Sequence, residues 1–202
     1  MNINSGSDWQ MQVPNLLSTF RLAASPVLLY FAWSGKPNHF LVLLALSFCS
    51  DCLDGYLARR LNSSSELGAK LDSWGDFAVY MTVPLCAWWL WPEIISREAY
   101  YVFTAIVSYV LPLIIGFLKF GRLSSYHTWS AKGAAILMSL AMFLLFLFDI
   151  VWLFHFSVIF HALGACEEIA ITFILSEWRC NIPTLWHAVA MVREKKESGC
   201  KK

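Results

Sequence analysis

Four aspartates lie within one short polar stretch of an otherwise apolar chain, and their spacing suggests joint chemistry. They are Asp51, Asp54, Asp72 and Asp76. The first two fall on one face of a helix, and the last two fall on one face of the next helix. Small residues share these faces and leave room for a ligand close to the backbone. They are Gly55, Ala58, Gly68 and Gly75.

The two helices that carry these faces are joined by the short polar sequence LNSSSE, so we expect them to be antiparallel neighbours. Two carboxylates from each helix can then converge. Oxygen ligands of this kind suit hard divalent ions such as magnesium or manganese, and four of them can hold two ions. The alternative is a set of structural ion pairs with Arg59, Arg60 and Lys70. That alternative leaves the small residues on the same faces unexplained.

The rest of the chain indicates a membrane protein. Of its 202 residues 58% are hydrophobic and 14% are charged, against about 25% charged in soluble domains, and the mean hydropathy is +0.56. A helix needs about 20 apolar residues to cross a bilayer. Six stretches qualify: 14–34, 38–60, 67–91, 98–120, 127–149 and 152–178. We therefore expect an all-α integral membrane bundle, and the net charge of +1 gives no sign of a nucleic-acid partner.

Positive charges set the expected orientation. With the N-terminus in the cytoplasm, only Lys36 and Arg97 of the 15 Lys and Arg residues fall on the outer side. The aspartates then lie at the cytoplasmic ends of the second and third helices. We expect a juxtamembrane segment at 1–13, a catalytic transmembrane domain at 14–183 and a solvated basic cytoplasmic tail at 184–202.

The polar stretch resembles the full signature of the CDP-alcohol phosphatidyltransferases. Asp51-x-x-Asp54-Gly55-x-x-Ala58-Arg59 is followed after eight residues by Gly68, and then at intervals of three residues by Asp72 and Asp76. The resemblance implies a six-helix membrane enzyme, a homodimer among membrane lipids, that moves a phosphatidyl group from CDP-diacylglycerol to a small alcohol and releases CMP.

The same resemblance implies roles for the residues of the signature. The four aspartates would hold two divalent ions, Mg²⁺ or Mn²⁺, and Asp76 would also take the proton of the attacking hydroxyl. The nucleotide would bind at Gly55, Ala58, Arg59 and Gly68. We expect such an enzyme in the bacterial cytoplasmic membrane, with its active site toward the cytoplasm.

The acceptor is less sharply indicated. The opening helix resembles those of the phosphatidylglycerophosphate and cardiolipin synthases at Pro14, Asn15, Leu17, Ser18, Arg21 and Pro26. The third helix departs from that subgroup, because Ser73 and Phe77 stand where proline and lysine are usual. Glycerol 3-phosphate is the first candidate. Inositol, inositol phosphate, serine and phosphatidylglycerol stay open.

Basic residues near the fifth and sixth expected helices favour an acceptor that carries a phosphate. They are Arg122, Lys132 and Arg179, and His127 lies near them. Glu167 and Glu168 are acids within the membrane, and either could pair with Lys132; neither is given a catalytic role.

Two other functions remain to be weighed. A divalent-cation transporter predicts acids through the depth of the membrane and repeated halves, whereas here the aspartates gather at one side. A phosphotransferase that uses a CDP-aminoalcohol fits less well with the short chain and its opening helix.

Overall fold

The computed structural model describes residues 5–61, 66–121, 126, 128–175, 177 and 182–199. Side chains are described for residues 16–51, 53, 74–121, 126, 128–175, 177 and 182–193. Every regular element in this part of the chain is a helix, which confirms the predicted all-α class. The helices are α1 (Ser5–Trp33), α2 (Pro37–Leu61), α3 (Glu66–Leu90), α4 (Pro92–Arg97), α5 (Ala99–Phe120), α6 (Trp129–Phe148), α7 (Val151–Ile174) and α8 (Leu185–Gly199).

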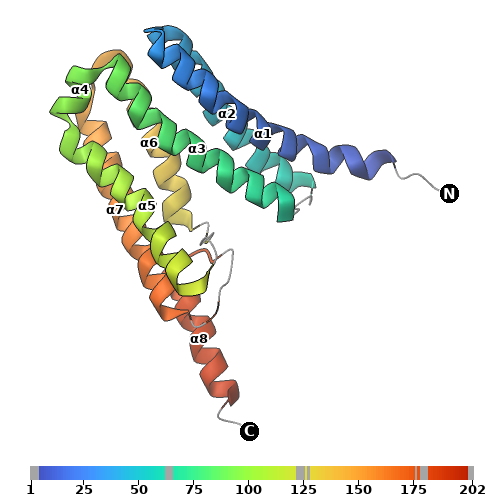
Figure 1. Ribbon diagram of the computed structural model, residues 1–202. Helices are drawn as coiled ribbons and strands as arrows, with labels where there is room; N and C mark the ends of the chain where they lie inside the picture. The colour runs from blue at the N-terminus through green and yellow to red at the C-terminus, as the bar shows by residue number, and fades with distance from the viewer. Residues whose placement is uncertain are drawn as a thin grey trace. The chain divides into compact units, whose positions relative to one another are not determined.

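The chain forms two compact units, Met1–Arg97 and Glu98–Lys202. In the first unit α1 packs against both α2 and α3, as Figure 1 shows. The turn from α1 to α2 needs a left-handed residue, which Gly35 provides with φ +63°. Pro37 then begins α2, at a position where a missing N–H costs nothing. Because the links are short, α1 and α3 run in one direction and α2 in the other.

Apolar side chains from all three long helices fill the core of the first unit. Leu28 of α1, Phe40 and Leu44 of α2, and Cys86 of α3 are each fully buried. Phe40 also meets the ring of Trp91 edge-on, with the centroids 6.0 Å apart. This packing fixes the register of the three helices, and with it the positions of the polar residues nearer the N-terminus of α1.

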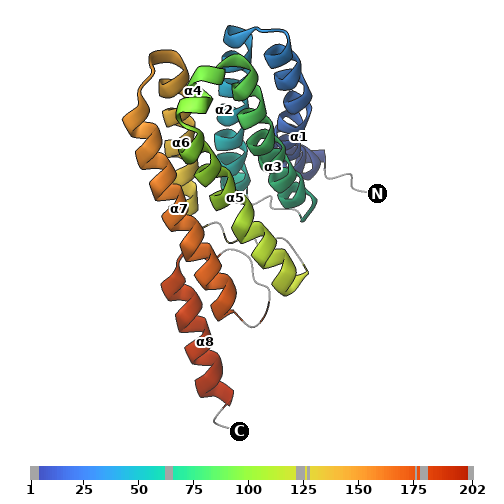
Figure 2. The same ribbon diagram turned by 60° about the vertical axis from the view of Figure 1, so that its left-hand side comes forward.

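In the second unit α7 packs against both α5 and α6 (Figure 2). Helix α5 ends at Gly121, whose φ of 65° lets its N–H donate to the carbonyl of Phe117 at 2.8 Å. Helix α6 begins after Thr128, whose side chain accepts from the N–H of Ala131. It ends at Asp149, a left-handed residue with φ 56°, and α7 begins two residues later. The two helices therefore form a tight hairpin.

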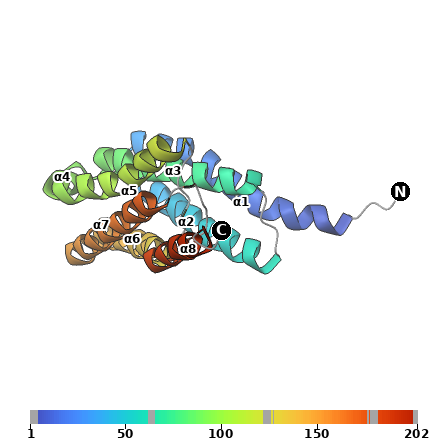
Figure 3. The ribbon, with the colours of Figure 1, turned by 90° about the horizontal axis from the view of Figure 1, so that it is seen from below.

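Residues 185–199 form helix α8, within the segment that the sequence predicts as a basic tail from Thr184 on. Ala188 is fully buried in a cluster with Tyr126, Ile171, Leu175 and Ile182. Helix α8 accordingly contacts α7, and the two are seen from below in Figure 3. Because the end of this segment is rich in charged residues, its sequence does not predict the apolar contact.

Four helices are long and apolar enough to cross a membrane within the described residues. They contain the spans Leu16–Trp33, Ala99–Phe120, Trp129–Phe148 and Val151–Ile174. Their length and apolar composition indicate an integral membrane protein. Helices α2 and α3 have 25 residues each, which at about 1.5 Å per residue is long enough to cross. The described parts of α2 and α3 are not apolar enough over a sufficient length to be counted as membrane spans. The predicted count of six spans is therefore not confirmed.

Candidate functional site

Two of the four signature aspartates meet at a buried arginine of the first helix. The Nη1 atom of Arg21 donates to Oδ1 of Asp51, and it donates to Oδ1 of Asp76 at 2.5 Å. Arg21 is 2% exposed, whereas the two aspartate side chains are 41% and 43% exposed. The predicted convergence of the second and third helices is therefore present for these two carboxylates.

A glycine on α3 creates the space for this arrangement. A Cβ placed on Gly75 would lie 3.5 Å from Cβ and 3.6 Å from Nε of Arg21. The same atom would lie 3.3 Å from the carbonyl oxygen of Ser18. The backbone of α3 therefore lies directly against α1 at this level, and Arg21 runs past it to the carboxylates. The sequence predicts that the small residues on this face leave room for a ligand. At Gly75 the space is used by helix α1.

The donor set at this point fits a hard divalent cation. Oxygens of Asp51 and Asp76 come from different helices yet contact a single positively charged nitrogen, so they are close enough to share one cation. Both carboxylates are partly open to solvent, which provides access for an ion and a ligand. No larger group of metal-binding side chains occurs among the described residues. The side chains of Asp54 and Asp72 lie outside them.

The remaining predicted residues of the donor site occur on the expected helices. Asp54, Gly55, Ala58 and Arg59 belong to α2, and Gly68 and Asp72 belong to α3. Their side chains lie outside the described part of the chain, as do those of Arg60 and Lys70. The first turns of α3 and the last turns of α2 are adjacent in the chain, so the signature occupies one end of the first unit.

Lys132, a predicted ligand of the acceptor's phosphate, lies in the first turn of α6 and is exposed. Its Nζ lies 5.4 Å from the centroid of the Trp129 ring, a cation–π contact that still leaves its N–H groups accessible. Arg122, His127 and Arg179 lie outside the described residues. The structure therefore places one of the three predicted phosphate ligands.

Glu167 does not pair with Lys132, although the sequence allowed that pairing. Its Oε2 accepts from the hydroxyl of Ser130 at 2.5 Å, and its Oε1 accepts from the backbone N–H of Leu185 at 3.0 Å. Leu185 is the first residue of α8, where an N–H has no partner within the helix. One carboxylate thus joins the start of α6, the middle of α7 and the start of α8. A negative charge at a helix N-terminus is also favourable.

A second group of contacts holds the C-terminal end of α7. Lys119 of α5 donates to the carbonyls of Thr172 at 2.9 Å and Phe173 at 3.1 Å, which lie in the last turn. Tyr126, between α5 and α6, forms a hydrogen bond with the hydroxyl of Thr172 at 2.9 Å. Burial raises the pKa of Tyr126 above its usual value; the hydrogen bond to Thr172 opposes this, and the nearby Glu168 adds to it. The neutral phenol is therefore the form present at neutral pH.

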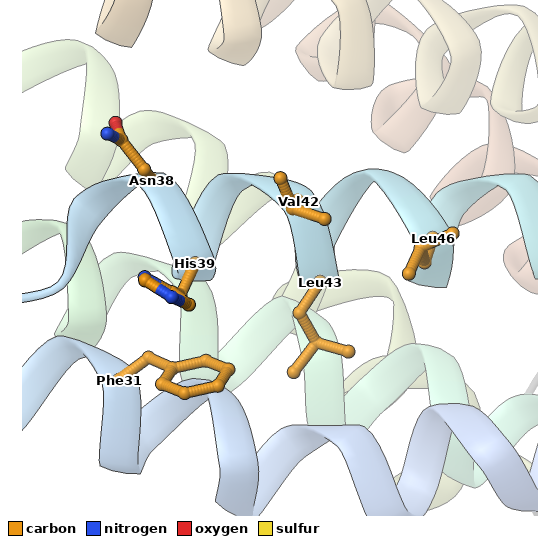
Figure 4. A pocket seen from close by; sticks show the side chains of 6 residues that line it. All are labelled: Phe31, Asn38, His39, Val42, Leu43 and Leu46. Atoms are coloured by element: carbon orange, nitrogen blue, oxygen red, sulfur yellow. The ribbon is translucent and has the colours of Figure 1, made fainter.

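An apolar depression of about 370 Å³ lies on the first unit, beside the turn between α1 and α2 (Figure 4). Phe31, Asn38, His39, Val42, Leu43 and Leu46 line it. Figure 4 shows the His39 ring facing Phe31, and their centroids are 5.5 Å apart. All six residues precede Asp51 in the chain, and neither Asp51 nor Asp76 lines the depression, so it is separate from the aspartate site.

Sequence reasoning missed the part that Arg21 plays. Arg21 was noted only as a match in the opening helix, where a long side chain could reach the interface. The alternative of structural ion pairs also places an arginine beside the aspartates, but it assigns that role to Arg59 or Arg60 and not to a residue of the opening helix. The usable signal was that Arg21 is the one cation within the Leu16–Trp33 span. An intramembrane charge requires a partner, and the signature aspartates are the natural ones.

The sequence matches the family model of CDP-alcohol phosphatidyltransferase over residues 11–191, which includes every residue of the signature.

Three curated relatives are similar over part of the chain. The CDP-diacylglycerol–glycerol-3-phosphate 3-phosphatidyltransferase of Aquifex aeolicus is 46% identical over 66 residues, which are 33% of this chain and 37% of that protein. The cardiolipin synthase (CMP-forming) of Streptomyces coelicolor is 37% identical over 106 residues, 46% of this chain and 49% of the relative. The CDP-diacylglycerol–inositol 3-phosphatidyltransferase 1 of Arabidopsis thaliana is 40% identical over 62 residues, 31% and 27% of the two chains.

The chain thus spans about half or less of the length of the curated relatives it matches. No solved structure matches it at a significant level.

Proposed function

We propose, because the chain belongs to the CDP-alcohol phosphatidyltransferase family, that it synthesises a phospholipid by moving a phosphatidyl group from CDP-diacylglycerol to an alcohol, with release of CMP. The observation that carries the proposal is the meeting of Asp51 and Asp76 at one cationic nitrogen. It supports a cation site made by two helices within the signature. A transporter needs acids along a whole path, and this site gathers them at one end of its unit.

The four signature aspartates, Asp51, Asp54, Asp72 and Asp76, would hold two divalent ions, Mg²⁺ or Mn²⁺. When bound, such ions neutralise charge on the diphosphate and on the departing CMP. Asp76 accepts the proton of the attacking hydroxyl, for which it has to lie within hydrogen-bond reach of the acceptor. A carboxylate beside a cation is a weak base, so positioning contributes much of its effect.

The nucleotide of the donor binds along the small faces of α2 and α3. Gly55, Ala58 and Gly68 leave room for it beside the backbone, and Arg59 supports it through charge. The acyl chains of the donor remain in the bilayer. A site at the cytoplasmic surface of the bacterial inner membrane lets a soluble acceptor reach the lipid, and the predicted distribution of Lys and Arg favours that orientation.

Glycerol 3-phosphate is the acceptor we propose. Two observations support it: the name of the Aquifex relative specifies this substrate, and the described Lys132 is an exposed cation at the start of α6. Arg122 and Arg179 would complete a phosphate-binding set with Lys132. Ser73 and Phe77 depart from the glycerophosphate pattern, so inositol, inositol phosphate, serine and phosphatidylglycerol stay open as alternative acceptors.

We also propose that residues 14–183 form the catalytic domain, that 1–13 lie beside the membrane and that 184–202 lie in the cytoplasm. The enzyme would work as a homodimer. These proposals rest on the family and on the distribution of charge.

A parallel acceptor assay tests the proposed function. Purified chain in detergent receives labelled CDP-diacylglycerol with glycerol 3-phosphate, inositol, inositol phosphate, serine or phosphatidylglycerol, each in separate reactions with Mg²⁺ and with Mn²⁺. We expect CMP and one labelled lipid, made fastest from glycerol 3-phosphate. Preference for an unphosphorylated acceptor would overturn the phosphate site but not the reaction. A further reaction offers a CDP-aminoalcohol with diacylglycerol, and faster release of CMP from that donor would overturn the reaction itself.

A further inference from the structure

We infer that Arg21 is a built-in counter-cation of the aspartate site, which holds Asp51 and Asp76 together before metal binds and has to turn away when metal arrives. The inference rests on the proposed function, because it assumes that these aspartates bind a divalent ion. By this inference a residue of α1, which lies outside the signature on α2 and α3, influences how tightly the metal binds.

The geometry places Arg21 in competition with a metal ion. Its Nη1 contacts the Oδ1 atoms of both Asp51 and Asp76, at 2.5 Å for Asp76. A divalent ion shared by these carboxylates would take the same oxygens at about 2.0–2.6 Å. The ion would then lie beside this nitrogen, and like charges at such short range repel even though both carboxylates are partly open to solvent. The same oxygens therefore serve the guanidinium or the ion in turn.

Burial explains why the arginine is needed when metal is absent. Two carboxylates that meet between helices repel each other, and removal of their cation leaves charge uncompensated. Arg21 is 2% exposed and sits between α1 and α3, so its charge is held at this place by packing. Without it, the end of the first unit that carries the signature would depend on metal to keep its helices together.

Packing against Gly75 keeps the displaced side chain at the site. The Nε atom of Arg21 lies 3.6 Å from the position of a Cβ on Gly75, so the stem of the side chain is fixed along the backbone of α3. The terminal nitrogens are then the part that can turn. Guanidinium groups bind phosphate oxygens well, and the diphosphate of the donor is the anion that the proposed function brings here. Metal binding would thus free Arg21 for the donor.

Metal binding and thermal unfolding of the purified full chain test the inference. The variants are Arg21→Met, which removes the charge and keeps much of the stem, and Arg21→Gln, which removes the charge and keeps a polar end that can still form hydrogen bonds with the carboxylates. The control is Lys119→Met, because Lys119 donates to backbone carbonyls of α7 in the other unit. The Kd for Mn²⁺ is measured by electron paramagnetic resonance without lipid substrate, and Tm is measured in chelator and in Mn²⁺.

We expect Arg21→Met to bind Mn²⁺ about tenfold more tightly than the unmodified chain, or tighter still, because a repelling charge is gone. Its Tm should fall in chelator and recover in Mn²⁺, whereas Lys119→Met should lower Tm equally in both. If Arg21→Met folds in neither condition, Arg21→Gln decides: a Kd below that of the unmodified chain supports the inference, and an equal or higher Kd overturns it. An unchanged or higher Kd for Arg21→Met also overturns it. If the unmodified chain itself binds no Mn²⁺, the metal site of the proposed function fails instead.

Discussion

Gly75 of α3 lies against the carbonyl of Ser18 of α1, since a Cβ on the glycine would be only 3.3 Å from that oxygen. The opposing atom belongs to a helix backbone and cannot rotate away. The distance between α1 and α3 at the level of Arg21 is therefore set by the absence of one methyl group.

Gly75→Ala should push α1 and α3 apart and shift Arg21. We expect the variant to lose about 1–3 kcal/mol of stability, as overpacked sites do, and to lose transferase activity with it. The matched control is Gly133→Ala in α6, where the added Cβ would meet the Phe160 ring at an ordinary 3.5 Å. Thermal unfolding and CMP release measure both variants. Equal stability of the two would show that the close approach at Gly75 is unimportant.

Asp76→Asn removes a carboxylate charge while it keeps the size of the side chain. If Asp76 is the general base, CMP release should fall by about 10²–10⁴-fold, and the product should still be the same lipid. Asp51→Asn should act mainly through metal, so excess Mn²⁺ should restore part of its activity. Full turnover of the unmodified chain in excess chelator would contradict the metal requirement on which both expectations rest.

Lys132→Ala should act on the acceptor. The loss of a charge-assisted hydrogen bond of about 1.5–3 kcal/mol lowers kcat/KM for glycerol 3-phosphate about 10- to 150-fold. The KM for CDP-diacylglycerol should change little, because metal neutralises the diphosphate of the donor. Lys36→Ala is the control, since Lys36 is an exposed lysine at the turn after α1. Equal effects on donor and acceptor would assign Lys132 a structural role.

Glu167→Ala should loosen the start of α8. It leaves the N–H of Leu185 and the hydroxyl of Ser130 without their acceptor, at a cost of about 1–3 kcal/mol. Glu167→Gln keeps an acceptor oxygen and should cost less. A double-mutant cycle with Ser130→Ala, read from denaturant unfolding, measures the coupling; Ser139→Ala, whose hydroxyl bonds within its own helix, is the control. Additive effects would argue against the link.

The apolar pattern predicted most of the fold, because long helices leave a plain periodic signal. The stretch predicted at 14–34 corresponds to α1, and the stretch at 152–178 corresponds to α7, which ends earlier, at Ile174. Helix α8 was not predicted because its burial depends on partners such as Tyr126 and Ile171, far away in the chain. The sequence of this segment is rich in charged residues, and a single small residue such as Ala188 does not reveal that one side of the helix is buried.

The candidate site was predictable where it follows from helical spacing and not where it depends on packing. Spacing places Asp51 and Asp76 on facing helices, and the structure brings them together. Spacing contains no information on which third helix covers the two aspartates, so by itself it does not predict that Arg21 contacts them. The partners of Glu167 were missed for the same reason: a backbone N–H such as that of Leu185 has no signature in a sequence.

The link between Glu167 and Leu185 also bears on the order in which the chain is made. Ser130 precedes Glu167 in synthesis, so one oxygen of the carboxylate finds its partner as soon as α7 folds beside α6. The other oxygen accepts from the N–H of Leu185, which is synthesised 18 residues after Glu167. Until then an acid within an apolar helix is only half satisfied, and water must supply the rest. The polar contacts of α7 are thus completed by a segment that follows it, and a chain that stops before Leu185 would leave one carboxylate oxygen of Glu167 without this partner.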